Sequence, residues 1–175
     1  GESKFLPKYP GLDERDLFGE ICQEMHAQGI KVMAYCHYGV IHRHAAAAHS
    51  EWLACERDGT PARWNGANQH FRTCMANEKF TAAMQGAILE LCANYQFEAL
   101  YLDGPTWYGD CHCEHCKNAY RQAYDEEMPG NLNFEDGSQQ KYNLIRDAAT
   151  ERIVRELRQA LPPEIPLLFN MTLRY

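Results

Sequence analysis

Residues 97–116 read FEALYLDGPTWYGDCHCEHC. The opening residues are mostly apolar, as expected of a buried strand, and they lead into Asp103 and Gly104. A carboxylate at the carboxyl end of a buried strand is a typical catalytic position in α/β enzymes. The loop that follows closes with a C-x-C-x-x-C cluster, whose spacing is typical of a soft-metal site. The stretch therefore predicts an active-site loop that is pinned by zinc.

Helix and strand patterns alternate along the rest of the chain. Asp13 is a suitable N-cap for the first helix, and Gly29 follows that helix as a stop signal. The predicted helices span residues 13–28, 77–95, 114–127 and 138–160, the predicted strands span 30–35, 97–102 and 165–170, and a long loop spans 40–77. Apolar strands that alternate with helices favour a parallel α/β sheet that is covered on both faces.

Polar side chains stand at the carboxyl end of each predicted strand, namely His37, Asp103 and Asn170. Active sites of (β/α)8 barrels lie at that end of the strands, whereas no G-x-G-x-x-G follows a strand here to indicate dinucleotide binding. The predicted fold class is therefore α/β, of the (β/α)8 TIM-barrel type. Only about three β/α units are visible, and a closed barrel has eight. We expect residues 1–175 to form part of a single barrel domain, with little or no activity on their own.

Composition narrows the classes of partner. The net charge is −7 and basic residues are scattered, so the chain lacks the footprint of a nucleic-acid-binding protein. No run of apolar residues is long enough for a transmembrane helix, and no membrane association is expected. The N-terminus lacks the apolar core of a signal peptide, which leaves localisation open with the cytoplasm preferred. Exposed edges of an incomplete sheet favour association, so a homo-oligomer is an open alternative.

Several motifs in order resemble the barrel of bacterial glycoside hydrolases. The resemblance is to the hypothetical glycosyl hydrolase families related to family 42 β-galactosidases and family 29 α-L-fucosidases. The motifs that carry it are CMAN at 74–77, LDGP at 102–105 and CHCEHC at 111–116, together with shorter matches at 16–20, 29–35, 49–52 and 58–59. The resemblance covers nearly the whole chain and places it at roughly the third through fifth strands of the barrel. It implies hydrolysis of O-glycosyl bonds in a carbohydrate substrate.

The resemblance also implies a structural zinc site. Family 42 enzymes hold zinc with three cysteines in a C-x-C-x-x-C loop after the fourth strand and one cysteine upstream, just before a helix. The matching residues here are Cys111, Cys113, Cys116 and the upstream Cys74. A site of four thiolates leaves no open position for water, so the zinc would be structural rather than catalytic. His112 or His115 in place of Cys74, and a cluster without metal, remain alternatives.

For Asp103 the resemblance offers two roles. The fucosidase-like families place their nucleophile at the Asp of an Asp-Gly pair that ends the fourth strand, which Asp103 matches. Family 42 enzymes instead carry Asn-Glu there, with the general acid, so the role of Asp103 stays open between nucleophile and acid. Capping of the next turn by the Asp103 side chain is the plain alternative. We expect the second carboxylate on a later strand, because the cysteine loop should carry Asp110 and Glu114 away.

Four further residues are predicted to contact the sugar: His37, Tyr38, Trp107 and Asn170. The first two end a strand on the expected active-site face, and an aromatic ring such as Trp107 can form an apolar platform for a sugar ring. Two functions compete with a glycoside hydrolase. One is a non-catalytic, zinc-stabilised module that binds carbohydrate or protein, and the other is a redox or metal sensor that uses the cysteines directly.

Overall fold

Helices and strands alternate in the computed structural model, which describes residues 3–65, 69–105 and 108–170. The elements in chain order are η1 (Pro10–Leu12), α1 (Leu17–Ala27), β1 (Met33–His37), β2 (Val40–His42), α2 (Arg43–Ala48), η2 (Ser50–Trp52), β3 (His70–Arg72), α3 (Glu78–Asn94), β4 (Ala99–Asp103), α4 (Glu114–Tyr124), α5 (Ser138–Ala160) and β5 (Leu167–Asn170). No helix of the described residues is long and apolar enough to cross a membrane.

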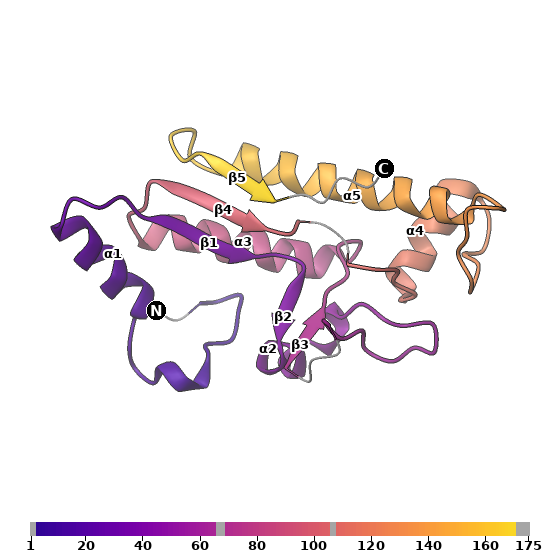
Figure 1. The fold of residues 1–175 in the computed structure, drawn as a ribbon, viewed down its shortest axis with the longest axis horizontal. Coiled ribbons are helices and arrows are strands. Elements are labelled where there is room, and N and C mark those ends of the chain that lie inside the picture. The colour runs from indigo at the N-terminus through magenta and orange to yellow at the C-terminus, as the bar shows by residue number, and fades with distance from the viewer. Residues whose placement is uncertain (1–2, 66–68, 106–107, 171–175) are drawn as a thin grey trace.

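The centre of the fold is a three-stranded parallel sheet in the order β1-β4-β5. Helices α3 and α5 connect successive strands and run along the sheet, as Figure 1 shows. The predicted α/β class with a parallel sheet is therefore confirmed. The pairing register places His37 opposite Asp103, and Asp103 opposite Asn170. All three predicted strand ends thus lie level at one edge of the sheet.

The two faces of this sheet differ in burial. Side chains alternate between the faces of a strand, and Ala34, Leu100 and Leu102 are fully buried in the core with α3 and α5. On the other face Met33 is 52% exposed and Tyr35 is 57% exposed. The expectation of a sheet covered on both faces is wrong for the described residues, because the helices pack on only one face.

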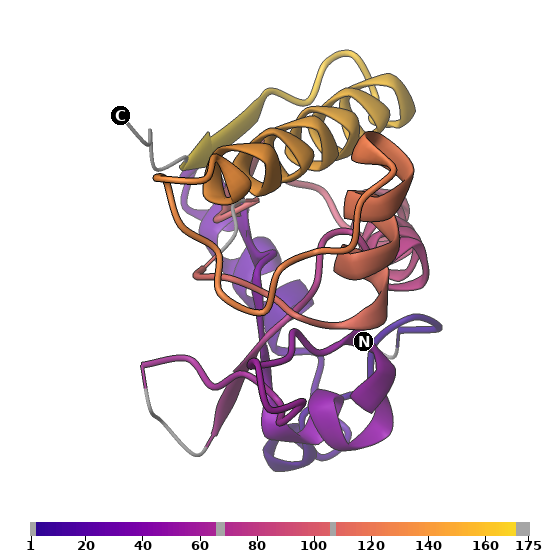
Figure 2. The same cartoon turned by 90° about the vertical axis from the view of Figure 1, so that its right-hand side faces the viewer.

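Residues 40–77 are not a plain loop. Strands β2 and β3 form an antiparallel pair, and helices α2 and η2 lie between them. In both views this region lies on the opposite side of the molecule from α5 (Figures 1 and 2). Trp52 and Leu53 are buried within it, which ties it to the main core. Strands of three residues leave too short a pattern for sequence reasoning to detect.

Two predicted boundaries at the start of the chain were displaced. Helix α1 is capped by Asp16, whose carboxylate accepts a hydrogen bond from the Gly19 amide at 3.3 Å, and not by Asp13. Strand β1 starts three residues later than predicted and includes His37. Val32, the residue just before β1, donates its amide hydrogen to the side chain of Glu98 at 2.7 Å. This side-chain bond takes the place of a strand partner for that amide.

The later helices lie close to their predicted positions. Helix α5 has the predicted bounds, and α3 starts after the predicted residue, Asn77, which caps it. Helix α4 ends at Tyr124, three residues early, because Asp125 takes a left-handed conformation with φ of 55°. Asparagine and aspartate adopt this conformation more readily than other non-glycine residues, so the helix stops there.

Replacing Asn77 by alanine should destabilise the fold. The Asn77 side chain is fully buried, accepts from the amides of Lys79 (3.0 Å) and Phe80 (3.4 Å), and donates to the carbonyl of Glu51 at 2.6 Å. Loss of the cap and of the buried partner should lower the free energy of unfolding by about 2 kcal/mol or more. Chemical denaturation measures this. Asn118→Ala on the exposed side of α4 is the control, and an equal effect of the two changes would contradict the prediction.

Candidate active site and cysteine cluster

The carboxyl ends of the three parallel strands bring together three of the predicted site residues. Asp103 ends the central strand, between His37 on β1 and Asn170 on β5. The amide nitrogen Nδ2 of Asn170 lies 3.4 Å from Oδ1 of Asp103, to which it donates a hydrogen bond. The three side chains therefore share the open face of the sheet at its carboxyl edge.

Tyr35 is a member of this site that sequence reasoning missed. Its hydroxyl donates to Oδ2 of Asp103, and its ring stacks on Tyr101 with 5.8 Å between centroids. The bond to Asp103, together with burial, raises the pKa of Tyr35 to about 12, so the phenol keeps its proton at neutral pH. The signal was present in the alternation of strand residues, since Tyr35 stands two residues before His37 and shares its face.

His37 carries an unsatisfied nitrogen. Its Nδ1 is buried and has no hydrogen-bond partner among the described residues. Burial lowers the pKa of His37, although the charge of Asp103 acts in the opposite direction. The lowered pKa favours the neutral imidazole at pH 7, and its buried Nδ1 keeps hydrogen-bonding capacity for an enclosed water molecule.

Tyr38 does not belong to the site. Its side chain is 1% exposed, its hydroxyl lies 3.5 Å from the carbonyl of Thr81, and its ring packs edge-on against Phe80. The expectation that it contacts a sugar is corrected by this burial. Consecutive residues of an extended chain point to opposite faces, so Tyr38 enters the core when His37 faces the site. Trp107, the other predicted aromatic contact, lies outside the described residues.

The loop after β4 folds back across the strand ends through Tyr108. Gly104 has a φ of +68°, and a Cβ atom there would overlap the Tyr108 hydroxyl. A Cβ atom at Gly39 would lie only 2.7 Å from Cε2 of the same ring. Tyr108 therefore rests against two glycines, one after each of β1 and β4. Side chains at either position would push the ring away from the strand ends.

Four cysteine thiols converge beside this loop. The Sγ atoms of Cys74, Cys111, Cys113 and Cys116 all lie within 4.8 Å of one another. Cys74 Sγ lies 3.5 Å from that of Cys116 and 3.4 Å from that of Cys113. Four sulfurs in a zinc tetrahedron lie about 3.8 Å apart. All eight cysteines lie in the described part of the chain and are free, so a reduced set of soft donors with the spacing of a metal site is available.

The electrostatics of the cluster also suit a cation. Hydrogen bonds from Cys111, Cys116 and Cys74 lower the pKa of Cys113. Cys111 and Cys113 raise the pKa of Cys74, because a second thiolate so close is unfavourable, whereas Cys116 acts in the opposite direction. A bound metal ion removes this conflict, since it allows all four sulfurs to ionise. Neither His112 nor His115, the alternative ligands, belongs to the group of converging donors.

The cluster joins separate parts of the fold. Cys74 precedes α3, whereas Cys116 lies in the first turn of α4. The amide of Cys111 donates to the hydroxyl of Tyr142 on α5 at 2.8 Å. The amide of Cys55, from the region between β2 and β3, points to Sγ of Cys111 at 3.5 Å. The four cysteines thus lie where the loop after β4 meets α5 and the 40–77 region.

The acidic residues that follow Asp103 in sequence face elsewhere. Oδ1 of Asp110 lies 3.2 Å from Nε2 of Gln139 and 3.8 Å from Nη1 of Arg146, both on α5. Glu114 forms an ion pair with Lys117 on the surface of α4 at 2.8 Å. Both carboxylates thus contact side chains of α4 or α5 instead of facing Asp103.

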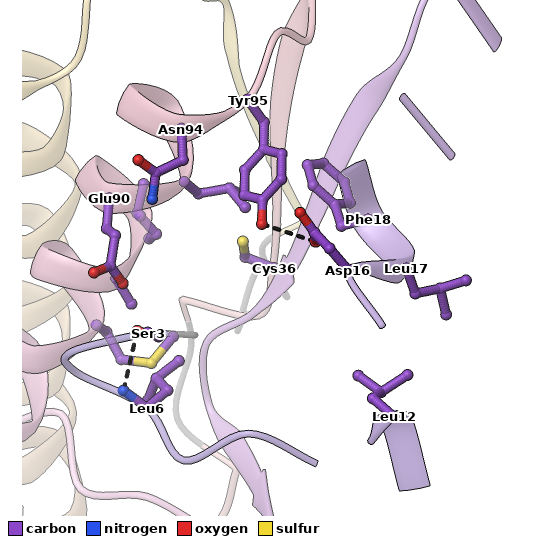
Figure 3. A pocket seen from close by; sticks show the side chains of 14 residues that line it. Ser3, Leu6, Leu12, Asp16, Leu17, Phe18, Cys36, Glu90, Asn94 and Tyr95 are labelled. Carbon is purple, nitrogen blue, oxygen red and sulfur yellow. Dashed lines mark hydrogen bonds between the residues drawn. The ribbon is translucent and has the colours of Figure 1, made fainter. Parts of the chain in front are cut away.

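A cavity of about 270 Å³ lies on the other face of the sheet, between the N-terminal segment, α1 and α3 (Figure 3). Its walls are mainly apolar, and the hydroxyl of Tyr95 donates to Oδ1 of Asp16 at 2.8 Å at its edge. Cys36 also lines it, and burial raises the pKa of that thiol to about 11, which keeps it protonated. Cys36 points away from the face of Tyr35 and His37, so this cavity is separate from the Asp103 site.

The sequence profile of one family, described as hypothetical glycosyl hydrolase 6, matches residues 1–104. This chain belongs to that family. The matched range includes Cys74 and Asp103 and ends before the C-x-C-x-x-C loop. No curated protein matches the chain.

Solved structures of glycosidases share the fold. An α-L-fucosidase isoenzyme 2 from Paenibacillus thiaminolyticus is 24% identical with a TM-score of 0.69, over 96% of this chain and 24% of that one. A β-galactosidase from Rahnella sp. R3 is 17% identical with a TM-score of 0.70, over 92% of this chain and 29% of that one. A family 42 β-galactosidase from G. stearothermophilus is 14% identical with a TM-score of 0.70, over 93% of this chain and 30% of that one. The resemblance predicted from sequence is confirmed, and this chain spans under a third of each glycosidase.

Asp103→Asn should lower the pKa of His37 further. The Asp103 carboxylate is the neighbour that favours the protonated imidazole, while burial opposes it. In the unchanged protein the pKa of His37 should lie below the ordinary value of about 6.5, and removal of the negative charge should shift it down again. An NMR titration of the His37 ring protons measures both values. Asp125→Asn is the matched control, and an upward shift in Asp103→Asn would refute the assignment.

Proposed function

We propose that this chain is part of the (β/α)8 barrel of a glycoside hydrolase. In this proposal residues 1–175 supply about three β/α units, roughly the third through fifth strands of eight. The parallel order β1-β4-β5, with the connecting helices on one face, supports it. So do the family membership and the shared fold with glycosidases of which this chain covers only a part. The exposed face with Tyr35 would then be the inner face of the barrel.

The observation that carries the proposed chemistry is the position of Asp103. Its carboxylate lies at the carboxyl end of the central strand and accepts hydrogen bonds from Tyr35 and Asn170. A carboxylate that accepts two hydrogen bonds is oriented for attack, whereas a general acid must present its own proton to the leaving group. We therefore assign Asp103 as the nucleophile of a retaining glycosidase.

The proposed reaction has two steps. The Asp103 carboxylate forms an ester with the anomeric carbon while the glycosidic C–O bond breaks, and the leaving oxygen takes a proton from a second carboxylic acid. The resulting carboxylate then accepts a proton from water, which attacks the anomeric carbon and releases Asp103. We place this second carboxyl group in another part of the full-length barrel. The His37 imidazole and the amide of Asn170, at the carboxyl ends of β1 and β5, are suited to hydrogen bonds with sugar hydroxyls.

The four cysteines are proposed to hold a structural zinc ion. Cys74, Cys111, Cys113 and Cys116 would occupy all four positions of the tetrahedron, which leaves none for water or substrate. When bound, the ion would supply only charge compensation and a fixed geometry. Its contribution to function would be to keep the loop after β4, and with it Tyr108, in place beside Asp103.

Asp103→Asn in the full-length protein should abolish most glycosidase activity. The amide keeps the shape of the side chain but cannot form the glycosyl ester, so kcat should fall by about 10⁴-fold or more. Hydrolysis of nitrophenyl β-galactosides and α-L-fucosides measures the loss, and Asp125→Asn on the surface after α4 is the control. Proton NMR of the first product should show retained anomeric configuration, as a nucleophilic carboxylate requires.

Three results would contradict these assignments. Full activity of Asp103→Asn would exclude a catalytic role for this residue. Inverted configuration of the product would exclude Asp103 as a covalent nucleophile. Sugar binding without hydrolysis by the unchanged full-length protein would favour the carbohydrate-binding module over the enzyme.

Cys74→Ser should deprive the protein of its zinc. The purified protein should hold about one zinc ion per chain, and removal of one of four thiolates should lower this content severalfold. Elemental analysis by mass spectrometry measures the ratio. Cys55→Ser is a close control, because the Cys55 amide contacts Sγ of Cys111 but the Cys55 thiol is not one of the four converging donors.

Acid should also release the ion, because its ligands must be thiolates and protonation removes them. The assignment fails if Cys74→Ser and Cys55→Ser retain equal amounts of zinc, or if the purified protein holds none. Loss of zinc on mild oxidation at neutral pH would instead favour the sensor, because a structural site should keep its metal under those conditions.

A further inference from the structure

Two aromatic rings from distant segments meet beside the strand ends. Trp64 comes from the region between β2 and β3, and Tyr108 comes from the loop after β4. Their ring centroids lie 4.2 Å apart with an angle of 67° between the planes. Both side chains are half-buried, so part of their aromatic surface faces outward. The two rings thus form an ordered pair with accessible aromatic surface, and they are not part of the buried core.

The backbone on each side of the pair is fixed. The amide of Trp64 donates to the carbonyl of His70 at 3.0 Å, which anchors it next to β3. The guanidinium of Arg72 donates to the carbonyl of Tyr108 and also pairs with Glu56. Arg72 therefore links the strand that supports one ring to the backbone of the other. Such pre-ordering lowers the entropy lost when a ligand packs on the rings.

The pair also lies next to the Asp103 site. The Tyr108 ring rests against Gly39 and Gly104, the glycines that follow the strand ends of β1 and β4. Its centroid is 6.3 Å from that of His37, whose register partner is Asp103. The charge of Asp103 acts on the Tyr108 hydroxyl and, together with the larger effect of burial, raises its pKa.

We propose that Trp64 and Tyr108 form a platform that binds the C–H face of a pyranose ring of the substrate. This inference rests on the proposed function, because the platform adjoins the Asp103 site. A pyranose with a contiguous C–H face packs on an aromatic surface, while polar groups fix its hydroxyls. His37, Asp103 and Asn170 supply polar groups on one side, and the aromatic pair supplies the apolar contact on the other. The region between β2 and β3 then provides part of the sugar site.

Trp64→Ala in the full-length protein tests the platform. The probes are methyl β-D-galactopyranoside and methyl α-L-fucopyranoside, whose binding is measured by titration calorimetry without any turnover. The Kd of the glycoside that binds, and the KM of the matching nitrophenyl glycoside, should rise about three- to tenfold, as expected for the loss of one aromatic contact. The kcat should change by less than about twofold, because the ring acts in binding rather than in chemistry.

Two variants complete the test. Trp64→Phe keeps an aromatic face and should retain most of the affinity even if alanine perturbs the local structure. Phe134→Ala, in the turn between α4 and α5 and 74% exposed, removes an aromatic ring elsewhere and should leave Kd and KM unchanged. A Trp64→Ala protein that binds and turns over like the unchanged protein would overturn the platform. So would an unchanged protein that binds neither methyl glycoside.

The platform and the proposed function can fail separately. If Asp103→Asn abolishes hydrolysis and Trp64→Ala has wild-type Kd and KM, the enzyme stands and the platform falls. If no glycoside is hydrolysed but a methyl glycoside binds more weakly to Trp64→Ala, the platform stands and the enzyme falls.

Discussion

Pairing of β4 on both of its edges is the constraint from which the rest of the site follows. The parallel ladder fixes Asp103 level with His37 and Asn170, and strand alternation puts Tyr35 on the same face. No loop conformation is needed to bring these groups together. Groups carried on regular strands are held more accurately than groups on loops, which would suit Asp103 in its proposed role as nucleophile.

The cysteine cluster solves a different problem, because the segments that flank the strand ends have little regular structure. The loop after β4 and the region between β2 and β3 contact each other through single hydrogen bonds, such as the amide of His112 to the carbonyl of Cys55 at 2.9 Å. The hydroxyl of Tyr142 on α5 contacts Cys111, and the proposed zinc on the four thiols at this junction would hold both segments to α5. The sheet positions the carboxylate, and the cluster positions the segments around it.

Sequence reasoning succeeded where a local pattern fixes the answer. Helix caps and apolar runs located the three strands of the parallel sheet and the long helices, and strand ends brought His37, Asp103 and Asn170 together. It failed where contacts between segments distant in the sequence determine the structure. The strands β2 and β3 are too short to leave a pattern, and Tyr38 was misplaced because its neighbour His37 already occupies the open face. Tyr35 was missed because an aromatic ring inside an apolar strand usually means core.

The separation of Cys74 from the other three cysteines has a consequence for folding. The proposed metal ion, bound by Cys74 and by the cysteines at 111–116, would close a loop of the chain that contains α3 and β4. A crosslink that closes a loop of about 40 residues lowers the conformational entropy of the denatured chain. In the loop-entropy description this destabilises the denatured state by roughly 4 kcal/mol. Within the proposed site, metal supply would thus govern how much of the chain remains folded at equilibrium. A shortage of the ion would first lower the amount of folded protein in the cell, before it changed the chemistry at Asp103.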